Sequence, residues 1–99
     1  MLKMTKNAAD DVLTIALEGR LDTNTAPDLE KELKESTEGI NELILDLEKL
    51  EYISSAGLRV LLAAQKTMAK KGGMKLIHVN DLIMEILDVT GFVDILEIE

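Results

Sequence analysis

Residues 43–62 have the sequence LILDLEKLEYISSAGLRVLL, in which the spacing of the apolar residues changes midway. The first five residues form a nearly continuous apolar run, typical of a central strand that is covered on both faces. From Leu58 onward, apolar residues recur every three to four positions, as on one face of a helix. Polar residues and two serines separate the patterns, so we expect a strand, a loop and a helix that begins near Ser54 or Ser55.

The residues before this stretch predict a hairpin and a first helix. Alternating apolar positions predict a strand over 12–17, and residues 2–6 are its expected antiparallel partner across a polar turn at 7–11. Thr25 offers an N-cap hydroxyl, followed by a proline in the first turn and an acid three residues on. A helix should therefore begin there and run to about Thr37.

The C-terminal part repeats the alternation of strand and helix. Residues 74–79 form a strand-like apolar run, and residues 93–98 are expected to be the last strand. Between them, Asn80 or Asp81 should cap a third helix. Its expected inward side chains are Leu82, Ile83, Ile86 and Leu87.

The predicted order is β, β, α, β, α, β, α, β within one domain that spans residues 1–99. Strands that alternate with helices pair in parallel through right-handed crossovers, whereas the N-terminal hairpin is antiparallel. We therefore predict an α/β fold, a small mixed sheet packed with three or four helices.

The composition excludes several classes of function. Acidic residues outnumber basic ones by 19 to 11, so we expect no direct nucleic-acid partner, because phosphate backbones bind surfaces of opposite charge. The absence of cysteine rules out disulfides and thiolate metal sites. No apolar run approaches the ~18 residues of a membrane span, and the N-terminus lacks a signal-peptide core. We expect a cytoplasmic monomer without membrane contact or cofactor.

The predicted topology brings two loops to one edge of the sheet. The strands that precede residues 19–22 and 52–58 should be parallel, so both loops should emerge at the carboxyl edge, where partner sites form. Ser55 would then lie at a helix N-terminus, where a phosphate group is favoured. Gly57 should keep that first turn bare, so that another protein can approach. A serine in this position is ordinarily only a cap, and Ser54 is the better candidate for the cap.

The run from Leu45 to Leu62 resembles the signature of STAS domains in anti-sigma-factor antagonists. Residues 19–22, followed by threonine and alanine at 25–26, are similar to the first-loop motif of that family. Residues 87–92 also fit its pattern, so the resemblance covers essentially the whole chain in order and spacing.

The resemblance implies a regulatory protein and not an enzyme. The unphosphorylated protein would bind an anti-sigma factor that is also a serine kinase, which releases the sigma factor, and phosphorylation of Ser55 would end that binding. Ser55 is implied because it lies two places before Gly57, and Ser54 is a second candidate. The family often has an aspartate where this chain has Ser54, and Ser or Thr where it has Ala56. A PP2C-type serine phosphatase is also implied.

The residues expected to bind the partner are Asp22, Thr23, Tyr52, Ser54, Ser55, Ala56, Gly57 and Arg59. A phosphate on Ser55 would lie next to Asp22, Glu48 and Glu51 in a surface that loses water on binding. The hypothesis requires that the Ser55 hydroxyl be accessible.

Two alternatives remain at this point. The first is an enzyme with Ser55 as nucleophile, disfavoured because His78 is the only histidine and is expected on a distant strand, in a structural role. The second is a STAS module that is never phosphorylated and serves as a scaffold or responds to a nucleotide.

Overall fold

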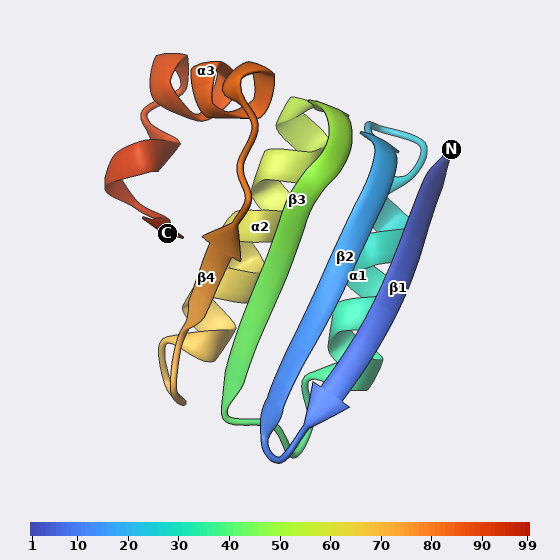
Figure 1. The fold of residues 1–99 in the computed structure, drawn as a ribbon, viewed down its shortest axis with the longest axis vertical. Coiled ribbons are helices and arrows are strands. Elements are labelled where there is room, and N and C mark those ends of the chain that lie inside the picture. The colour runs from blue at the N-terminus through green and yellow to red at the C-terminus, as the bar shows by residue number, and fades with distance from the viewer.

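Five strands follow chain order across one sheet, β1-β2-β3-β4-β5, in the computed structural model, which describes residues 1–99 (Figure 1). The strands are β1 (Leu2–Ala9), β2 (Val12–Leu21), β3 (Glu42–Ile53), β4 (Met74–Ile77) and β5 (Glu97–Ile98). The helices are α1 (Ala26–Ser36), α2 (Ser55–Met68), α3 (Asp81–Val89) and the short 3-10 helix η1 (Phe92–Asp94). The predicted order of elements, the antiparallel hairpin and the parallel strands after it are confirmed.

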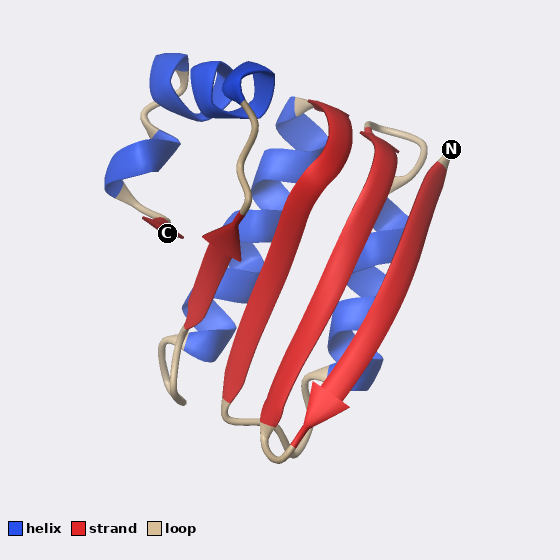
Figure 2. Ribbon diagram, viewed as in Figure 1, coloured by secondary structure: helices blue, strands red, loops and turns tan.

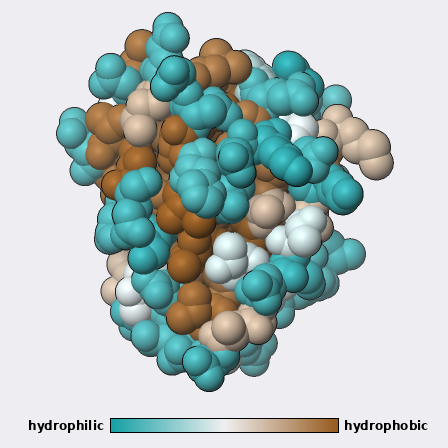
Figure 3. All heavy atoms as spheres, in the orientation of Figure 1, coloured by the Kyte–Doolittle hydropathy of each residue, from teal (hydrophilic) through white to brown (hydrophobic).

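Helices α1 and α2 lie together behind the sheet, whereas the other face of β1, β2 and most of β3 carries no helix (Figure 2). Strand β3 therefore buries Leu43, Leu45 and Leu47 against the helices, while Ile44 and Asp46 between them stay half-buried. The prediction that this strand is covered on both faces was wrong, because the only remaining long helix, α3, packs at the end of the sheet. Figure 3 shows the open face, where apolar side chains alternate with hydrophilic ones.

Strand β3 continues to Ile53, six residues beyond the apolar run that predicted it. Its pairing with β2 shifts register twice, so that β3 uses two more residues than β2 over the same length. Each shift is a β-bulge, which breaks the two-residue period of a strand. The buried positions after Leu47 are consequently Leu50 and Ile53, three apart, and this spacing made residues 48–53 resemble a loop.

The hairpin turn is tighter than predicted. Strands β1 and β2 extend to Ala9 and Val12, so only Asp10 and Asp11 remain in the turn. Asp10 takes a left-handed conformation with φ of 58°, which two-residue hairpins require and aspartate tolerates.

The C-terminal region departs most from the prediction. The strand predicted over 93–98 is replaced by η1, which begins at Phe92, and by the two-residue strand β5, because β4 is short and pairs with β5 only through Lys75 and Leu76. Helix α3 has the predicted bounds, but Leu82 is 52% exposed, whereas Ile83 and Leu87 are buried.

The core is aliphatic and continuous, with 22 buried apolar residues contributed by both strands and helices. Helices α1 and α2 contribute Leu29, Leu33, Leu58 and Leu61 to this core. None of the helices is both long enough and apolar enough to cross a membrane.

Candidate functional site

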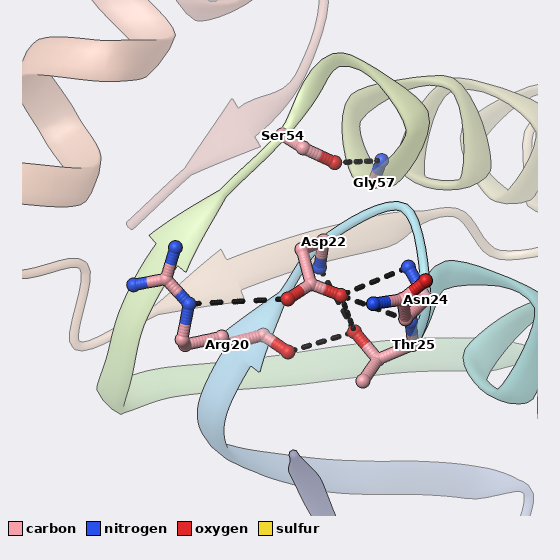
Figure 4. Close-up of polar contacts among 6 residues, drawn as sticks. All are labelled: Arg20, Asp22, Asn24, Thr25, Ser54 and Gly57. Atoms are coloured by element: carbon pink, nitrogen blue, oxygen red, sulfur yellow. Dashed lines mark hydrogen bonds and ion pairs between the residues drawn. The ribbon is translucent and has the colours of Figure 1, made fainter.

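The two predicted loops meet at the carboxyl ends of β2 and β3. Leu21 and Ile53, the last residues of these strands, are paired in parallel register. Beyond them, the Ser54 amide donates a hydrogen bond to the Leu21 carbonyl oxygen at 2.8 Å. The loop that contains Asp22 therefore lies beside the first turn of α2, as Figure 4 shows.

The two adjacent serines have different surroundings. Ser54 is the N-cap of α2, and its Oγ accepts a hydrogen bond from the Gly57 amide at 3.3 Å. Ser55 is the first helical residue and is exposed, so its hydroxyl meets the requirement of accessibility. The amides of Ser55 and Ala56 have no backbone acceptor, as expected for the first turn of a helix.

Asp22 organises its own loop. Its Oδ1 accepts hydrogen bonds from the amides of Asn24 at 3.0 Å and Thr25 at 3.1 Å. Desolvation acts to raise the pKa of Asp22, but the hydrogen bonds from the Thr25 and Asn24 amides hold it below its ordinary value. The charged carboxylate thus stabilises the turn that precedes α1.

Thr25 stands at the N-cap position of α1, as predicted, but its hydroxyl makes no capping hydrogen bond. The hydroxyl turns back into the loop, where it donates to the Arg20 carbonyl oxygen at 2.7 Å and accepts from the Asp22 amide at 2.8 Å. The prediction of a hydroxyl cap was wrong, because the hydroxyl hydrogen and oxygen of Thr25 are both used in hydrogen bonds to the backbone of the loop.

Arg20 and Tyr52 form the outer border of the site. The Arg20 guanidinium lies over the Tyr52 ring, 4.6 Å from its centre, and its Nε is 3.8 Å from Asp22 Oδ2. Tyr52 is 36% exposed, so part of this residue remains accessible to solvent beside Arg20.

Gly57 is buried and is required by the protein's own packing. A Cβ atom at this position would lie 2.7 Å from Leu21 Cγ and 3.0 Å from the Leu21 carbonyl oxygen. The interpretation that Gly57 leaves room for another protein was wrong, since the space is filled by β2. The missing side chain allows α2 to begin directly against the end of β2.

The remaining predicted contact residues surround Ser55. Thr23 and Arg59 are exposed, and Ala56 is half-buried beside the core. The Arg59 guanidinium forms no salt bridge, although it lies one helical turn from Ser55.

Glu48 lies away from this edge, in the middle of β3, with roughly 15 Å of extended chain between it and the loop. It belongs to a second polar cluster with Asp46 and His78, whose potential metal-ligating atoms lie within 4.8 Å of one another. Asp46 Oδ1 accepts from the Glu48 amide at 3.1 Å and lies 3.2 Å from His78 Nδ1. The expectation that a phosphate would adjoin Glu48 was therefore wrong.

This second cluster is not apparent from the sequence. His78 was expected within a strand, but it follows β4 in a left-handed conformation with φ of 54° and is exposed. The cluster depends on the register between β3 and β4, in which Asp46 pairs with Ile77. Only a prediction of strand register could have brought Asp46 and His78 together.

Two hollows in the surface lie elsewhere. One, of about 260 Å³, lies between α1 and α2, and the other, of about 290 Å³, lies on the open face of the sheet. Neither is lined by Ser55 or by the loop of Asp22. Ser55 therefore lies outside both of these hollows.

Comparisons with known proteins identify relatives of this chain. The family model described as STAS domain matches residues 3–99. BtrV of Bordetella bronchiseptica, assigned as an anti-sigma factor antagonist, is 34% identical over 96 residues, which cover 95% of this chain and 83% of BtrV. The anti-sigma-B factor antagonist of Bacillus subtilis is 30% identical over 87 residues, which cover 87% of this chain and 80% of that protein. An anti-sigma factor antagonist from Mycobacterium paratuberculosis shares the fold, with a TM-score of 0.88 at 22% identity over 99% of this chain and 85% of that one.

Proposed function

The chain belongs to the STAS domain family, and from this we propose that it is an anti-sigma-factor antagonist that phosphorylation of Ser55 switches off. The single observation that carries the proposal is the difference between two neighbouring hydroxyls. Ser54 is engaged as the helix cap, whereas Ser55 is exposed at the carboxyl edge of the sheet. The protein acts in the cytoplasm as a monomer.

The surface around Ser55 is the docking surface for the anti-sigma factor. Thr23, Tyr52 and Arg59 are exposed side chains of this surface. Asp22 stabilises the first loop through hydrogen bonds from the amides of Asn24 and Thr25. An aromatic ring and an arginine are the side chains that most often dominate protein interfaces. Binding of the unphosphorylated protein occupies the anti-sigma factor and so releases the sigma factor.

The same partner phosphorylates Ser55. The Ser55 Oγ attacks the γ-phosphorus of ATP bound to the kinase, a new O–P bond forms, and the bond to the β–γ bridging oxygen breaks to release ADP. A base of the kinase accepts the hydroxyl proton. A PP2C-type serine phosphatase reverses the step with water, which returns the serine hydroxyl and inorganic phosphate.

Phosphorylation ends the binding by local electrostatics. The phosphate adds about −1.5 to −2 charges at neutral pH, at an edge that already contains Asp22 and Glu51. A change from 99% bound to 1% bound requires about 5.5 kcal/mol of differential affinity. Desolvation of the phosphate and repulsion within the interface act in that direction, and the fold stays unchanged.

The surroundings of Ser55 support a regulatory role over an enzymatic one. The only histidine, His78, lies next to Asp46 on the far side of β3, so it offers no general base to Ser55.

The test is phosphorylation by serine kinases of the anti-sigma type, with the modified residue mapped by mass spectrometry. The expected label is on Ser55, absent in Ser55→Ala and unchanged in the matched Ser54→Ala variant. Equal labelling of Ser55→Ala would contradict the assignment of Ser55.

A binding measurement separates the switch from a scaffold or a nucleotide-responsive module. The anti-sigma factor should bind the unmodified protein and lose at least a hundredfold in affinity for the phosphorylated one. Affinity that is the same for both forms would support the scaffold. Binding that depends on added nucleotide in the absence of phosphorylation would support the nucleotide-responsive module.

A further inference from the structure

The chain has two arginines, and both lie near the proposed switch. Arg20 is already engaged, by the Tyr52 ring at 4.6 Å and by Asp22 at 3.8 Å. Arg59 is exposed and forms no salt bridge. The structure therefore leaves one of the two guanidinium groups without an anionic partner.

Arg59 lies one helical turn after Ser55. Residues four apart in a helix face the same side, with roughly 6 Å between their Cβ atoms. An anion that precedes a cation by four residues is the favourable orientation, because it also matches the helix dipole. Ser55 and Arg59 have this order and are both exposed.

The first turn of α2 offers further donors and contains no acid. The amides of Ser55 and Ala56 have no backbone acceptor, while the Gly57 amide is taken by Ser54 Oγ. No aspartate or glutamate stands in this turn to balance the positive end of the helix. A phosphate on Ser55 would thus meet two free N–H groups and a guanidinium that is able to donate two parallel hydrogen bonds.

We propose, on the basis of the proposed function, that Arg59 binds the phosphate of phosphorylated Ser55 within the same chain. Arg59 is then a positioning residue of the switch with two effects. It holds the phosphate against the first turn of α2, and it is itself withdrawn from the surface that docks the partner. Phosphorylation therefore changes two charges of the docking surface, the new phosphate and the captured arginine.

The experiment uses full-length protein with phosphoserine incorporated at position 55 during translation, so that no kinase is needed. The second ionisation of the phosphate, near pH 6 for a free phosphoserine, is followed by ³¹P NMR at fixed salt. An arginine bound to the phosphate favours its doubly charged form and lowers this midpoint. Arg59→Gln should therefore raise the midpoint by about half a pH unit.

Lys66→Gln is the matched control. It removes the same charge from the same helix, but Lys66 lies eleven residues from Ser55, roughly 16 Å along the axis. At physiological salt that distance is about two Debye lengths, so the midpoint should move by less than about 0.1 pH unit. Arg59→Lys keeps the charge without the planar guanidinium and should give an intermediate shift.

The test needs only the phosphorylated protein, without a kinase or a partner. Equal midpoints in Arg59→Gln and Lys66→Gln would overturn the capture of the phosphate by Arg59, whether or not a kinase modifies Ser55. A clear shift in Arg59→Gln would support the capture even if no anti-sigma kinase labels Ser55, in which case only the proposed function would fail.

Discussion

Helices α2 and α3 begin with the same cap geometry, but the residues after the cap differ. Ser54 and Asn80 are both extended N-caps, with φ and ψ of −90° and 173° in one and −76° and 169° in the other. Each side chain accepts a hydrogen bond from the amide three residues on, at 3.3 Å from Gly57 and 2.9 Å from Ile83.

The first helical residue is Asp81 in α3 and Ser55 in α2. One turn later, α3 has Glu85 where α2 has Arg59. Helix α3 therefore has an acid of its own at the positive end of its dipole, whereas α2 has a neutral serine there and a cation in reach. The difference teaches that phosphorylation would supply to α2 the negative charge that α3 has permanently.

The largest effect is expected at Asn80, which joins α3 to the sheet. Its Oδ1 caps the helix, and its side-chain Nδ2 donates to the carbonyl oxygens of Leu50 at 2.9 Å and Leu47 at 3.3 Å, across the bulged part of β3. Asn80→Ala should lower the free energy of unfolding by about 2–3 kcal/mol, as measured in urea, because it removes the cap and leaves carbonyl groups without a donor. Asn80→Ser keeps a cap but cannot reach β3, and should recover about 1 kcal/mol of this loss. A loss in Asn80→Ala no greater than that of Ser54→Ala would show that the contact with β3 contributes nothing.

The third helical residue gives the next largest effect. Ile83 fills this position in α3 with a fully buried side chain, whereas α2 has Gly57 packed against Leu21. Gly57→Ala should destabilise the protein by about 1 kcal/mol. The steric clash costs about 1–3 kcal/mol, and the higher helix propensity of alanine offsets slightly less than about 1 kcal/mol of this cost. Urea unfolding measures the change, and a Leu21→Ala background should remove most of it. A variant more stable than the wild type would mean that propensity outweighs packing.

Much of the fold follows from local patterns in the sequence. Caps and apolar periods predicted the order of the five strands and three α-helices, because each of these effects acts within a few residues. The errors lie where distant pairing decides the structure. The bulges of β3 hide its second half, and the short edge of β4 limits β5 to Glu97–Ile98.

The candidate site was predictable to a smaller extent. Parallel topology alone brought the loop of Asp22 to the first turn of α2, and capping preferences distinguished Ser54 from Ser55. The reason for Gly57 and the inward turn of the Thr25 hydroxyl were not predictable, since both depend on atoms that approach from β2 and its loop. Single-sequence patterns do not contain that information.

Alanine variants of the two serines should affect different properties, stability for Ser54 and regulation for Ser55. Ser54→Ala removes the cap of α2 and should cost about 1 kcal/mol of stability, while it leaves phosphorylation intact. Ser55→Ala removes no internal contact and should change the free energy of unfolding by less than about 0.5 kcal/mol. Thermal or urea unfolding of both variants checks this. A larger loss in Ser55→Ala would mean that the hydroxyl has an internal structural role and would weaken its assignment as the free acceptor.

The smallest expected effect is the pH dependence that comes from Asp22. Hydrogen bonds hold its pKa in the folded protein below the ordinary value of 3.8, so the charged form stabilises the fold at neutral pH. That contribution is fully present above about pH 5 and is lost as the pH falls through the lower folded value. Asp22→Asn keeps the oxygen that accepts from Asn24 and Thr25 but removes the charge, so it should be less stable than the wild type at pH 7.

The difference between Asp22→Asn and wild type, measured by urea unfolding from pH 7 to pH 2.5, should shrink towards the acid end. Glu32 also has a lowered pKa, through its contacts with Lys6 and Ser36, but it is present in both proteins and cancels from the difference. A difference that stays constant with pH would assign the loss to geometry rather than charge. A difference that vanishes in acid would identify the Asp22 carboxylate as the group that orders the loop beside Ser55. Weaker partner binding by Asp22→Asn at neutral pH would then reflect a less ordered loop as well as any lost contact.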